Sequence, residues 1–250
     1  ERGVQAKYAY NFDPVKQPFL SSFIYINTSK TSFLDDLKAS GVLLYWEHPI
    51  ITQQLYFEPS DPSFSLQWHL DKIMAPDAWG TAQGDSSFVL AVVDSGVDYM
   101  HDDLKDNLAY NYDDPINGLD DDNDGYIDNY YGWDFGSNDH DPMVDGTNFL
   151  AHGSSICGVA AASTNNAIGA ASPAFNCRYL PIKITNSVGY LIDTNAGILY
   201  GAQMGAQVIN CSFGSLDFSQ AEADVIQYVT DSMNVLVVAS AGNEGLNTDV

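Results

Sequence analysis

The sequence has little positive charge, no long apolar run and few cysteines. Nine Lys and Arg residues stand against 33 Asp and Glu residues, which gives a formal net charge of -24. A chain with this balance repels nucleic-acid phosphates and anionic lipid surfaces, so we expect no nucleic-acid partner. No apolar run approaches the roughly 18 to 20 residues that span a bilayer, so we expect no membrane insertion.

The scarcity of cysteine restricts disulfides and metal sites. Cys157, Cys177 and Cys211 allow at most one internal disulfide and form no Cys-x-x-Cys pair. We therefore expect no structural zinc site and interpret the three as buried free thiols. The sequence starts at Glu1 without a Met or an apolar leader. Any export signal is therefore expected to have been removed or to lie outside this sequence.

Apolar residues are plentiful, and the acidity is local. Of the 250 residues, 45% are hydrophobic and 12% aromatic, which is enough to form a sizeable core. Of the 33 acids, 28 are Asp, and 16 of these lie between Asp94 and Asp145, where Lys105 is the only cation. Carboxylates crowded in this way repel one another, so this stretch predicts a bound counter-ion.

The first 58 residues predict a small α+β unit. Residues 19–26 and 42–46 are typical of strands, and residues 32–40 are typical of a short helix closed by Gly41. Residues 58–63 carry two prolines and no apolar side chain, as a linker does. We therefore expect two domains, residues 1–58 and residues 59–250.

The remainder predicts an α/β fold with a doubly wound, mainly parallel sheet. Four near-continuous apolar runs, typical of strands covered on both faces, occupy residues 88–93, 179–184, 207–211 and 234–239. Helix-length segments at residues 193–205 and 219–233 fit right-handed crossovers between the last three of these strands. Ligands of such sheets bind beyond the carboxyl ends of the strands, so we look for functional residues there.

Three polar residues stand where the chemistry of such a fold is expected. Asp94 ends the first apolar run and is followed by a glycine two residues later; alone, an acid there is commonly a turn former. His152 begins a helix of small residues, which allow a helix to approach a sheet closely. Asn243 follows the last run in a Gly-flanked turn, where an amide donor can face developing oxyanion charge.

These three residues, in this order, resemble the subtilisin-like serine proteases. The motifs are Val-Val-Asp-Ser-Gly around Asp94, Ala-His-Gly-Ser-Ser around His152 and Ser-Ala-Gly-Asn ending at Asn243. The resemblance implies that Asp94 orients His152, that His152 is general base and then general acid, and that Asn243 stabilises the oxyanion. It also implies two segments that bind the backbone of a polypeptide substrate: Ser212, Phe213 and Gly214, and Ser240, Ala241 and Gly242.

The sequence also departs from the family. Most members have Gly-Thr-His where this chain has Gly153-Ser154-Ser155, and Cys157 replaces a small residue. The nucleophile motif Gly-Thr-Ser-Met-Ala is absent from the sequence. The resemblance implies a nucleophilic serine about 60 to 80 residues beyond Val250, so we expect this chain alone to be inactive. The alternative is a catalytically inactive, calcium-dependent binding or surface protein on the same scaffold.

The acidic stretch contains a partial calcium-loop pattern. Positions 1, 3, 5 and 9 of an EF-type loop fall on Asp120, Asp122, Asp124 and Asp128, and position 7 falls on Tyr126, whose carbonyl would be the ligand. Position 12 is a tyrosine, so the bidentate acid is missing. Hard oxygen ligands at this density favour Ca²⁺ over Zn²⁺. The alternative is a solvated acidic turn.

The resemblance implies further features. A second, weaker calcium site would use Asn166 with Asp103 and Gln67, where an ordinary Asn-rich turn is the alternative. Residues 1–58 are similar in pattern to the propeptides that inhibit such proteases, so the chain's own propeptide is an expected partner; an unrelated accessory domain is the alternative. The acidic composition and the calcium loop favour a secreted or cell-surface protein.

Overall fold

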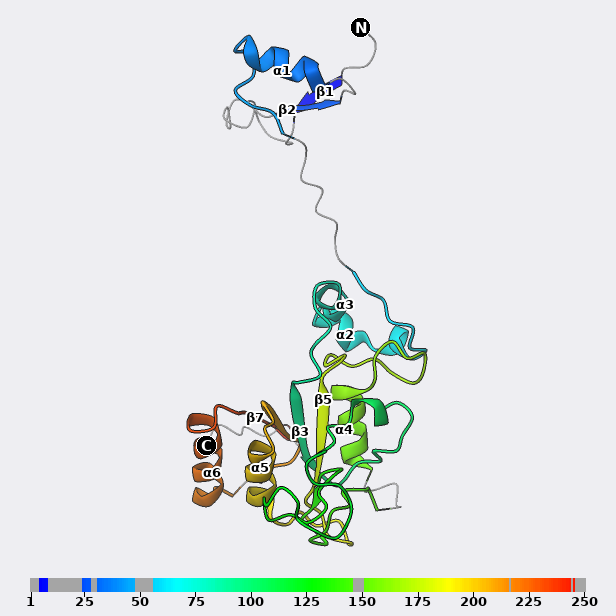
Figure 1. Cartoon of the computed structure of the whole chain (residues 1–250), viewed down its shortest axis with the longest axis vertical. Helices are drawn as coiled ribbons and strands as arrows, with labels where there is room; N and C mark the ends of the chain where they lie inside the picture. The colour runs from blue at the N-terminus through cyan, green and yellow to red at the C-terminus, as the bar shows by residue number, and fades with distance from the viewer. Residues whose placement is uncertain are drawn as a thin grey trace. The chain divides into compact units, whose positions relative to one another are not determined.

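The computed structural model describes residues 5–8, 24–27, 31–47, 56–145, 151–215, 217–243 and 245. The chain forms two compact units, Glu1–Gln53 and Gln54–Val250. Figure 1 draws their helices and strands from blue at the amino terminus to red at the carboxyl terminus.

The smaller unit contains two strands and a helix. Strands β1 (Gln5–Tyr8) and β2 (Ile24–Asn27) pair antiparallel, and α1 (Thr31–Ala39) follows them. Helix α1 matches the predicted helix, and Gly41 after it has a φ of +76°, as a glycine at this position commonly does. Strand β2 overlaps the predicted first strand at residues 24–26; residues 19–23 lie outside the described residues.

The predicted strand at residues 42–46 is wrong. The N–H groups of Val42 and Leu43 both donate to the carbonyl of Leu37, at 3.0 and 3.1 Å. The chain therefore folds back onto the end of the helix instead of extending, and Leu44 is 90% exposed. A run of apolar residues predicts a strand only where another strand is available to pair with it.

The larger unit is built on a five-stranded parallel sheet. The strand order is β4-β5-β3-β6-β7, and every neighbouring pair is parallel. The strands are β3 (Val89–Asp94), β4 (Trp133–Asp134), β5 (Arg178–Lys183), β6 (Val208–Cys211) and β7 (Leu236–Ala239). Four of them lie in the predicted apolar runs, which confirms the predicted α/β class and the mainly parallel sheet. The two-residue strand β4 was not predicted.

Helices cover both faces of this sheet. Helix α4 (His152–Ala161) packs on one face, and α5 (Thr194–Gln203) and α6 (Gln220–Asp231) pack on the other. The unit also contains η2 (Phe64–Leu66), α2 (Trp68–Lys72), α3 (Ala75–Trp79) and η3 (Lys105–Asn107). Val92 packs in one core with Cys157 of α4, whereas Val93 packs in the other with Ile198 of α5. Alternate residues of β3 therefore face opposite layers, as the period of a strand requires. Asp94, two residues after Val92, lies on the α4 face.

Among the described residues, every helix is too short or too polar to cross a lipid bilayer.

Candidate active site

Asp94 and His152 meet at the carboxyl edge of the sheet. His152 Nδ1 lies 2.9 Å from Asp94 Oδ1 and 3.0 Å from Asp94 Oδ2. The Asp94 side chain is 5% exposed, whereas that of His152 is 53% exposed. Because an ionised carboxylate only accepts hydrogen bonds, Nδ1 carries the proton between them, and Nε2 remains as the acceptor of the neutral ring. The arrangement fixes the tautomer that a general base needs.

Two glycines make this approach sterically feasible. A Cβ on Gly153, the second residue of α4, would lie 2.3 Å from the carbonyl oxygen of Gly96 and 3.1 Å from Asp94 Cβ. Gly96 has a φ of +94°, which side-chain-bearing residues rarely adopt. The Gly153 N–H also donates to Ser95 Oγ at 3.1 Å. The first turn of α4 is thereby pressed against the turn that follows β3, which brings His152 to Asp94.

A buried lysine stands next to this turn. Lys183 Nζ lies 3.0 Å from Asp134 Oδ2 and 3.0 Å from Asp145 Oδ2, and its side chain is 3% exposed. Burial lowers the pKa of the Lys183 ammonium, but the hydrogen bonds and charges of the two carboxylates outweigh this and raise it. Lys183 is therefore charged and held by two acids.

Cys157 lies in the core on the α4 face of the sheet. It is fully buried, and burial, followed by the charge of Asp94, raises the pKa of its thiol well above the ordinary value. Cys211 is also buried and Cys177 is half-buried; all three are free thiols. The interpretation of buried free thiols therefore holds for Cys157 and Cys211, whereas Cys177 is free but only partly buried.

The two predicted substrate-binding segments follow neighbouring strands. Ser212, Phe213 and Gly214 follow β6, and Ser240, Ala241 and Gly242 follow β7. The two strands remain paired to their ends, because the Ser240 N–H donates to the Cys211 carbonyl at 3.0 Å. Asn243, the predicted oxyanion donor, is exposed after β7. All these residues lie at the edge of the sheet where Asp94 ends β3.

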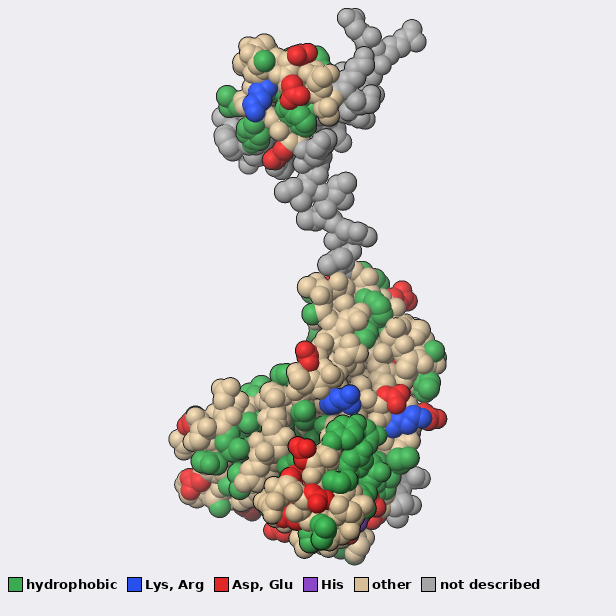
Figure 2. All heavy atoms as spheres, viewed as in Figure 1, with side chains coloured by type: hydrophobic (Ala, Val, Ile, Leu, Met, Phe, Trp, Pro, Cys, Tyr) green, Lys and Arg blue, Asp and Glu red, His purple; other side chains and the backbone are tan. Residues whose placement is uncertain are grey.

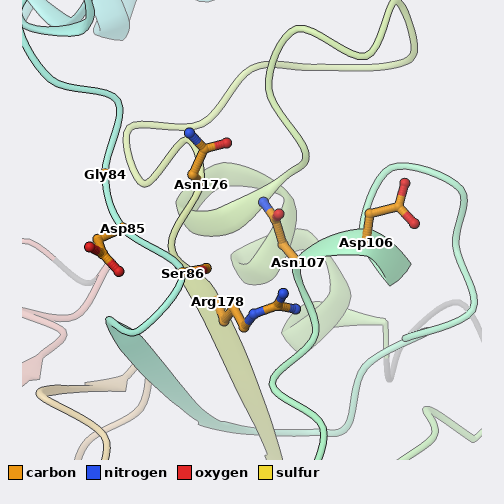
Figure 3. A pocket seen from close by; sticks show the side chains of 7 residues that line it. All are labelled: Gly84, Asp85, Ser86, Asp106, Asn107, Asn176 and Arg178. Carbon is orange, nitrogen blue, oxygen red and sulfur yellow. The ribbon is translucent and has the colours of Figure 1, made fainter.

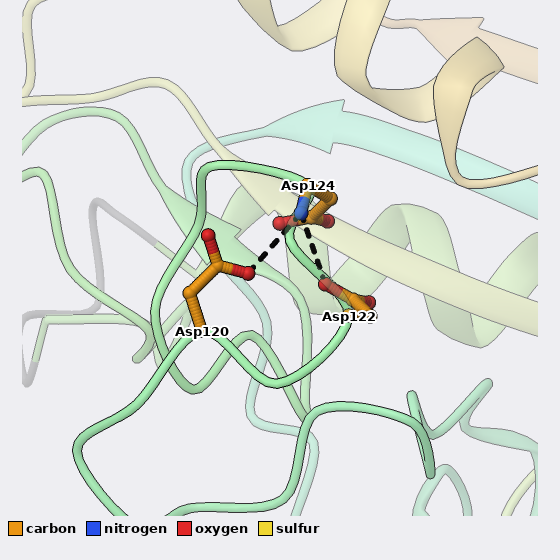
Figure 4. A group of neighbouring side chains, drawn as sticks. All are labelled: Asp120, Asp122 and Asp124. Atoms are coloured by element: carbon orange, nitrogen blue, oxygen red, sulfur yellow. Dashed lines mark hydrogen bonds between the residues drawn. The ribbon is translucent and has the colours of Figure 1, made fainter.

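The acidic loop, residues 113–128, gathers three of its predicted ligands. Carboxylate oxygens of Asp120, Asp122 and Asp124 all lie within 4.8 Å of one another (Figure 4). The Asp124 N–H donates to Asp120 Oδ1 and Asp122 Oδ1, at 3.1 and 3.2 Å. Burial, with the charges of Asp122 and Asp120 adding to it, raises the pKa of the Asp124 carboxyl, although N–H donors from Tyr126 and Asn129 oppose the rise. In Figure 2, acidic side chains gather at the lower end of the larger unit.

The carboxylate of Asp128, another predicted ligand of this loop, makes different contacts. Asp128 Oδ1 accepts hydrogen bonds from the backbone N–H groups of Asn117 and Gly118, both at 2.7 Å. The Tyr126 ring packs edge-on against Trp133 at 5.0 Å between ring centroids. The carboxylate of Asp128 therefore holds the beginning of the loop rather than joining the three clustered acids.

The second predicted calcium loop closes on itself. Asn166 Nδ2 donates to Asp103 Oδ1 at 2.9 Å, and the Ala170 N–H donates to Asp103 Oδ2 at 2.9 Å. Gln67 exchanges two hydrogen bonds with the backbone of Ala171, both at 2.8 Å. These residues do lie together, and their polar atoms are paired by the protein itself.

A shallow pocket of about 480 Å³ lies away from the catalytic pair. Figure 3 shows its lining side chains around Arg178, the first residue of β5. The lining residues are Gly84, Asp85, Ser86, Asp106, Asn107, Asn176 and Arg178. Because residues 84–86 precede β3, the pocket lies at the amino edge of this parallel sheet, opposite the edge that carries Asp94. It therefore does not belong to the candidate active site.

The chain matches a known protein family. The family model described as Peptidase_S8, Subtilase family, matches residues 85–250, which include the whole sheet. The chain belongs to the subtilase family. The resemblance seen in the sequence motifs is thereby confirmed.

Several named subtilase relatives match over most of this chain. It is 38% identical over 173 residues to a thermophilic serine proteinase of Bacillus sp. (strain AK1), covering 68% of this chain and 37% of the relative. It is 34% identical over 192 residues to thermitase of Thermoactinomyces vulgaris, covering 76% of this chain and 59% of thermitase. The chain therefore spans less than two thirds of these relatives' own length.

Solved structures show the same subtilase fold. Proteases from Pseudoalteromonas arctica PAMC 21717 align with a TM-score of 0.58 and 30% identity, covering 76% of this chain and 60% of that one. A complex of an Aeromonas sobria serine protease with its chaperone aligns with a TM-score of 0.57 and 18% identity, covering 75% of this chain and 32% of that chain. The second likeness supports the fold alone.

The sequence analysis did not predict the roles of two residues that support the contact between Asp94 and His152. Ser95 stands in the motif around Asp94, but its role as acceptor of the Gly153 N–H was not predicted, and Lys183, whose stem packs on Gly96, lies outside the motifs that carry the resemblance. Lys183 did leave a signal, because it is a charged residue inside the otherwise apolar run of residues 179–184. A lysine in a strand buried on both faces requires a partner, and two aspartates supply it.

Proposed function

We propose that this chain is part of a serine endopeptidase in which Asp94 and His152 are two members of the catalytic triad. The observation that carries the proposal is the pair of contacts of 2.9 and 3.0 Å between His152 Nδ1 and the Asp94 carboxylate. The nucleophile would be a serine beyond Val250, because the chain spans only part of the relatives it matches. Residues 1–250 alone would then be inactive.

His152 acts as the proton carrier in this mechanism. Its Nε2 would accept the proton of the attacking serine hydroxyl and then donate it to the leaving amine. Asp94 holds the ring in the correct tautomer and stabilises the imidazolium that forms. Because Asp94 is buried while His152 is half exposed, the acid is shielded from solvent and the ring remains accessible to substrate.

The substrate would be a polypeptide bound as an added strand. Its backbone would pair with the segments Ser212–Phe213–Gly214 and Ser240–Ala241–Gly242, which follow adjacent strands at the same edge as His152. Asn243 would donate to the oxyanion; removal of one such donor typically costs about 3 kcal/mol of transition-state stabilisation.

Calcium would stabilise the acidic loop. Asp120, Asp122 and Asp124 form a set of hard oxygen donors, and their mutual repulsion is relieved by a divalent cation. The loop's own residues already shape this set, because the N–H of Asp124 holds two of the carboxylates in place. The carbonyl of Tyr126 and the carboxylate of Asp128 stay predicted ligands; a metal contact of Asp128 would compete with the hydrogen bonds that its Oδ1 accepts from the N–H groups of Asn117 and Gly118.

Calcium at the second loop stays a prediction. The hydrogen bond from Asn166 to Asp103 satisfies both side chains without an ion. This loop therefore keeps its shape by itself, and its donor set fits a cation less well than that of the acidic loop.

Domain roles and location complete the proposal. Residues 1–58 would act as an inhibitory propeptide ahead of a peptidase domain that begins at residue 59. A secreted or cell-surface location would supply calcium and polypeptide substrates. Among the relatives is a "Halolysin-like extracellular serine protease Nep" of Natrialba magadii, 33% identical over 190 residues, covering 74% of this chain and 31% of the relative.

Hydrolysis of a denatured protein by the full-length gene product tests the function. We expect Asp94→Asn to lower kcat by about 10⁴-fold, because the wrong tautomer then dominates, and His152→Ala to abolish turnover. His101→Ala is the matched control, because this histidine is exposed and contacts neither residue. A folded full-length protein without peptidase activity would instead favour the calcium-dependent binding protein.

A further inference from the structure

Lys183 is the direct neighbour of Asp94 across the sheet. In the register of the parallel strands, Asp94 of β3 pairs with Lys183 of β5, and Lys183 pairs with Asp134 of β4. Residues paired in this way project from the same face, so the three side chains form a row of alternating charge at the carboxyl edge. Lys183 is also the one buried Lys or Arg among the described side chains.

The stem of Lys183 packs against the turn that carries the catalytic pair. A Cβ built on Gly96 would lie 2.9 Å from Lys183 Cδ, so the methylene chain lies directly against this glycine. The carbonyl oxygen of Gly96 lies next to Gly153 in the first turn of α4, where a Cβ would approach it to 2.3 Å. The turn after β3 is therefore in contact with both the lysine stem and α4.

The ammonium group of Lys183 binds the carboxylates of Asp134 and Asp145. Its two partners differ in burial: the Asp134 side chain is 2% exposed, whereas that of Asp145 is 44% exposed. Asp145 precedes His152 by seven residues along the chain. Pro142, three residues before Asp145, accepts a hydrogen bond from the N–H of Val97 at 3.0 Å, so the contact with Asp145 holds a segment that packs on the same turn as the lysine stem.

We propose that Lys183 is a positioning residue for the Asp94–His152 pair, acting through its stem on Gly96 and through its ion pair with Asp145. It touches neither substrate nor the reacting atoms in this role. The effect of Lys183 on the hydrogen bond between His152 Nδ1 and Asp94 follows from the geometry alone. Its effect on turnover rests on the proposed peptidase function.

Three variants of the full-length protein test this inference. Lys183→Met keeps an apolar stem and removes the charge, and Lys183→Arg keeps the charge. Asp145→Asn removes only the ion pair with the half-exposed Asp145. Asp102→Asn is the matched control, because Asp102 forms an exposed ion pair with Lys105 elsewhere in the unit. The readout is the low-field proton resonance of His152 Nδ1–H, assigned by its loss in His152→Ala, together with the melting temperature.

We expect Asp145→Asn to speed exchange of this proton with water by about 10-fold or more without a large change in melting temperature. Lys183→Met should have a larger effect, Lys183→Arg should restore most of the protection, and Asp102→Asn should change nothing. In an active enzyme, kcat should fall on the order of 10- to 100-fold in Lys183→Met, with KM changed less than about 2-fold.

An unchanged resonance in Asp145→Asn and Lys183→Met would overturn the proposal and leave Lys183 a purely structural residue. If Lys183→Met does not fold, Asp145→Asn decides alone. A protein that shows the expected resonance changes yet cleaves no peptide would contradict the proposed function and still support the positioning role.

Discussion

The closest contact at the active site predicts a large effect of one methyl group. Gly153 is buried in the first turn of α4, and a Cβ there would lie 2.3 Å from the carbonyl oxygen of Gly96. The obstructing atoms belong to the backbone and cannot rotate away. Gly153→Ala must therefore push the start of α4 away from the turn after β3.

The size of this displacement follows from the contact. Carbon and carbonyl oxygen ordinarily approach to about 3.3 Å, so α4 must move by roughly 1 Å. The same shift would lengthen the His152–Asp94 contact from 2.9 Å to roughly 3.9 Å, beyond hydrogen-bonding range. Overpacking of this kind costs about 1–3 kcal/mol of unfolding free energy, equivalent to roughly 2–12 °C in melting temperature. A misplacement of about 1 Å at the reacting groups can lower kcat on the order of 10²-fold.

Gly158→Ala provides a matched control in the same helix. A Cβ on Gly158 would meet nothing within 4 Å, so this change should stabilise α4 by about 0.5–1 kcal/mol. Melting by circular dichroism and peptide hydrolysis by the full-length protein measure both variants. If Gly153→Ala melts and turns over like Gly158→Ala, the close approach of α4 to β3 is not what forms the pair.

Three further properties can be measured. EGTA should lower the melting temperature by several degrees, because an ion that binds only the folded state stabilises it by about 2.7 kcal/mol at 100 times its Kd. Asp120→Asn should reduce this shift, and Asp121→Asn should not. A melting curve unaffected by EGTA would contradict the proposed calcium site. Backbone N–H donors, that of Asn117 first, lower the pKa of Asp128. Its contribution to stability is therefore complete above the ordinary Asp pKa of about 3.9 and is lost as the pH falls through the lower pKa of the folded state. The stability of Asp128→Asn should depend less steeply on pH in this acid range, and a pH profile identical to that of the wild type would refute this. Burial raises the pKa of Cys157, so iodoacetamide at pH 8 should modify Cys177 and leave Cys157 intact by mass spectrometry of the native protein, whereas early modification of Cys157 would contradict its burial.

The sequence predicted those parts of the fold that depend on local pattern. Apolar runs bounded by turn residues predicted β3, β5, β6 and β7, because strands covered on both faces need apolar side chains throughout. Strand β4 was missed because two residues carry no period, and only their pairing with β5 makes them a strand. The strand predicted at residues 42–46 failed for the converse reason, since its backbone bonds to the end of α1 instead.

The site was predicted only in part. Motifs pointed to Asp94 and His152 because each stands at the end of a recognisable element. The supporting roles of Lys183 and Ser95 were not predicted, although Ser95 stands in the motif around Asp94, because these roles arise from register and from contacts between segments far apart in the sequence. Asp128 fits the loop pattern by spacing, yet the structure commits its carboxylate to backbone N–H groups.

Labelling of the full-length protein with a fluorophosphonate probe tests the central claim most directly. The account predicts that the probe attaches to a serine beyond residue 250 and that His152→Ala, with folding verified, loses the label, because that serine is activated only through the Asp94-oriented imidazole. Absence of label on the folded wild-type protein, or equal labelling rates in wild type and His152→Ala, would contradict it.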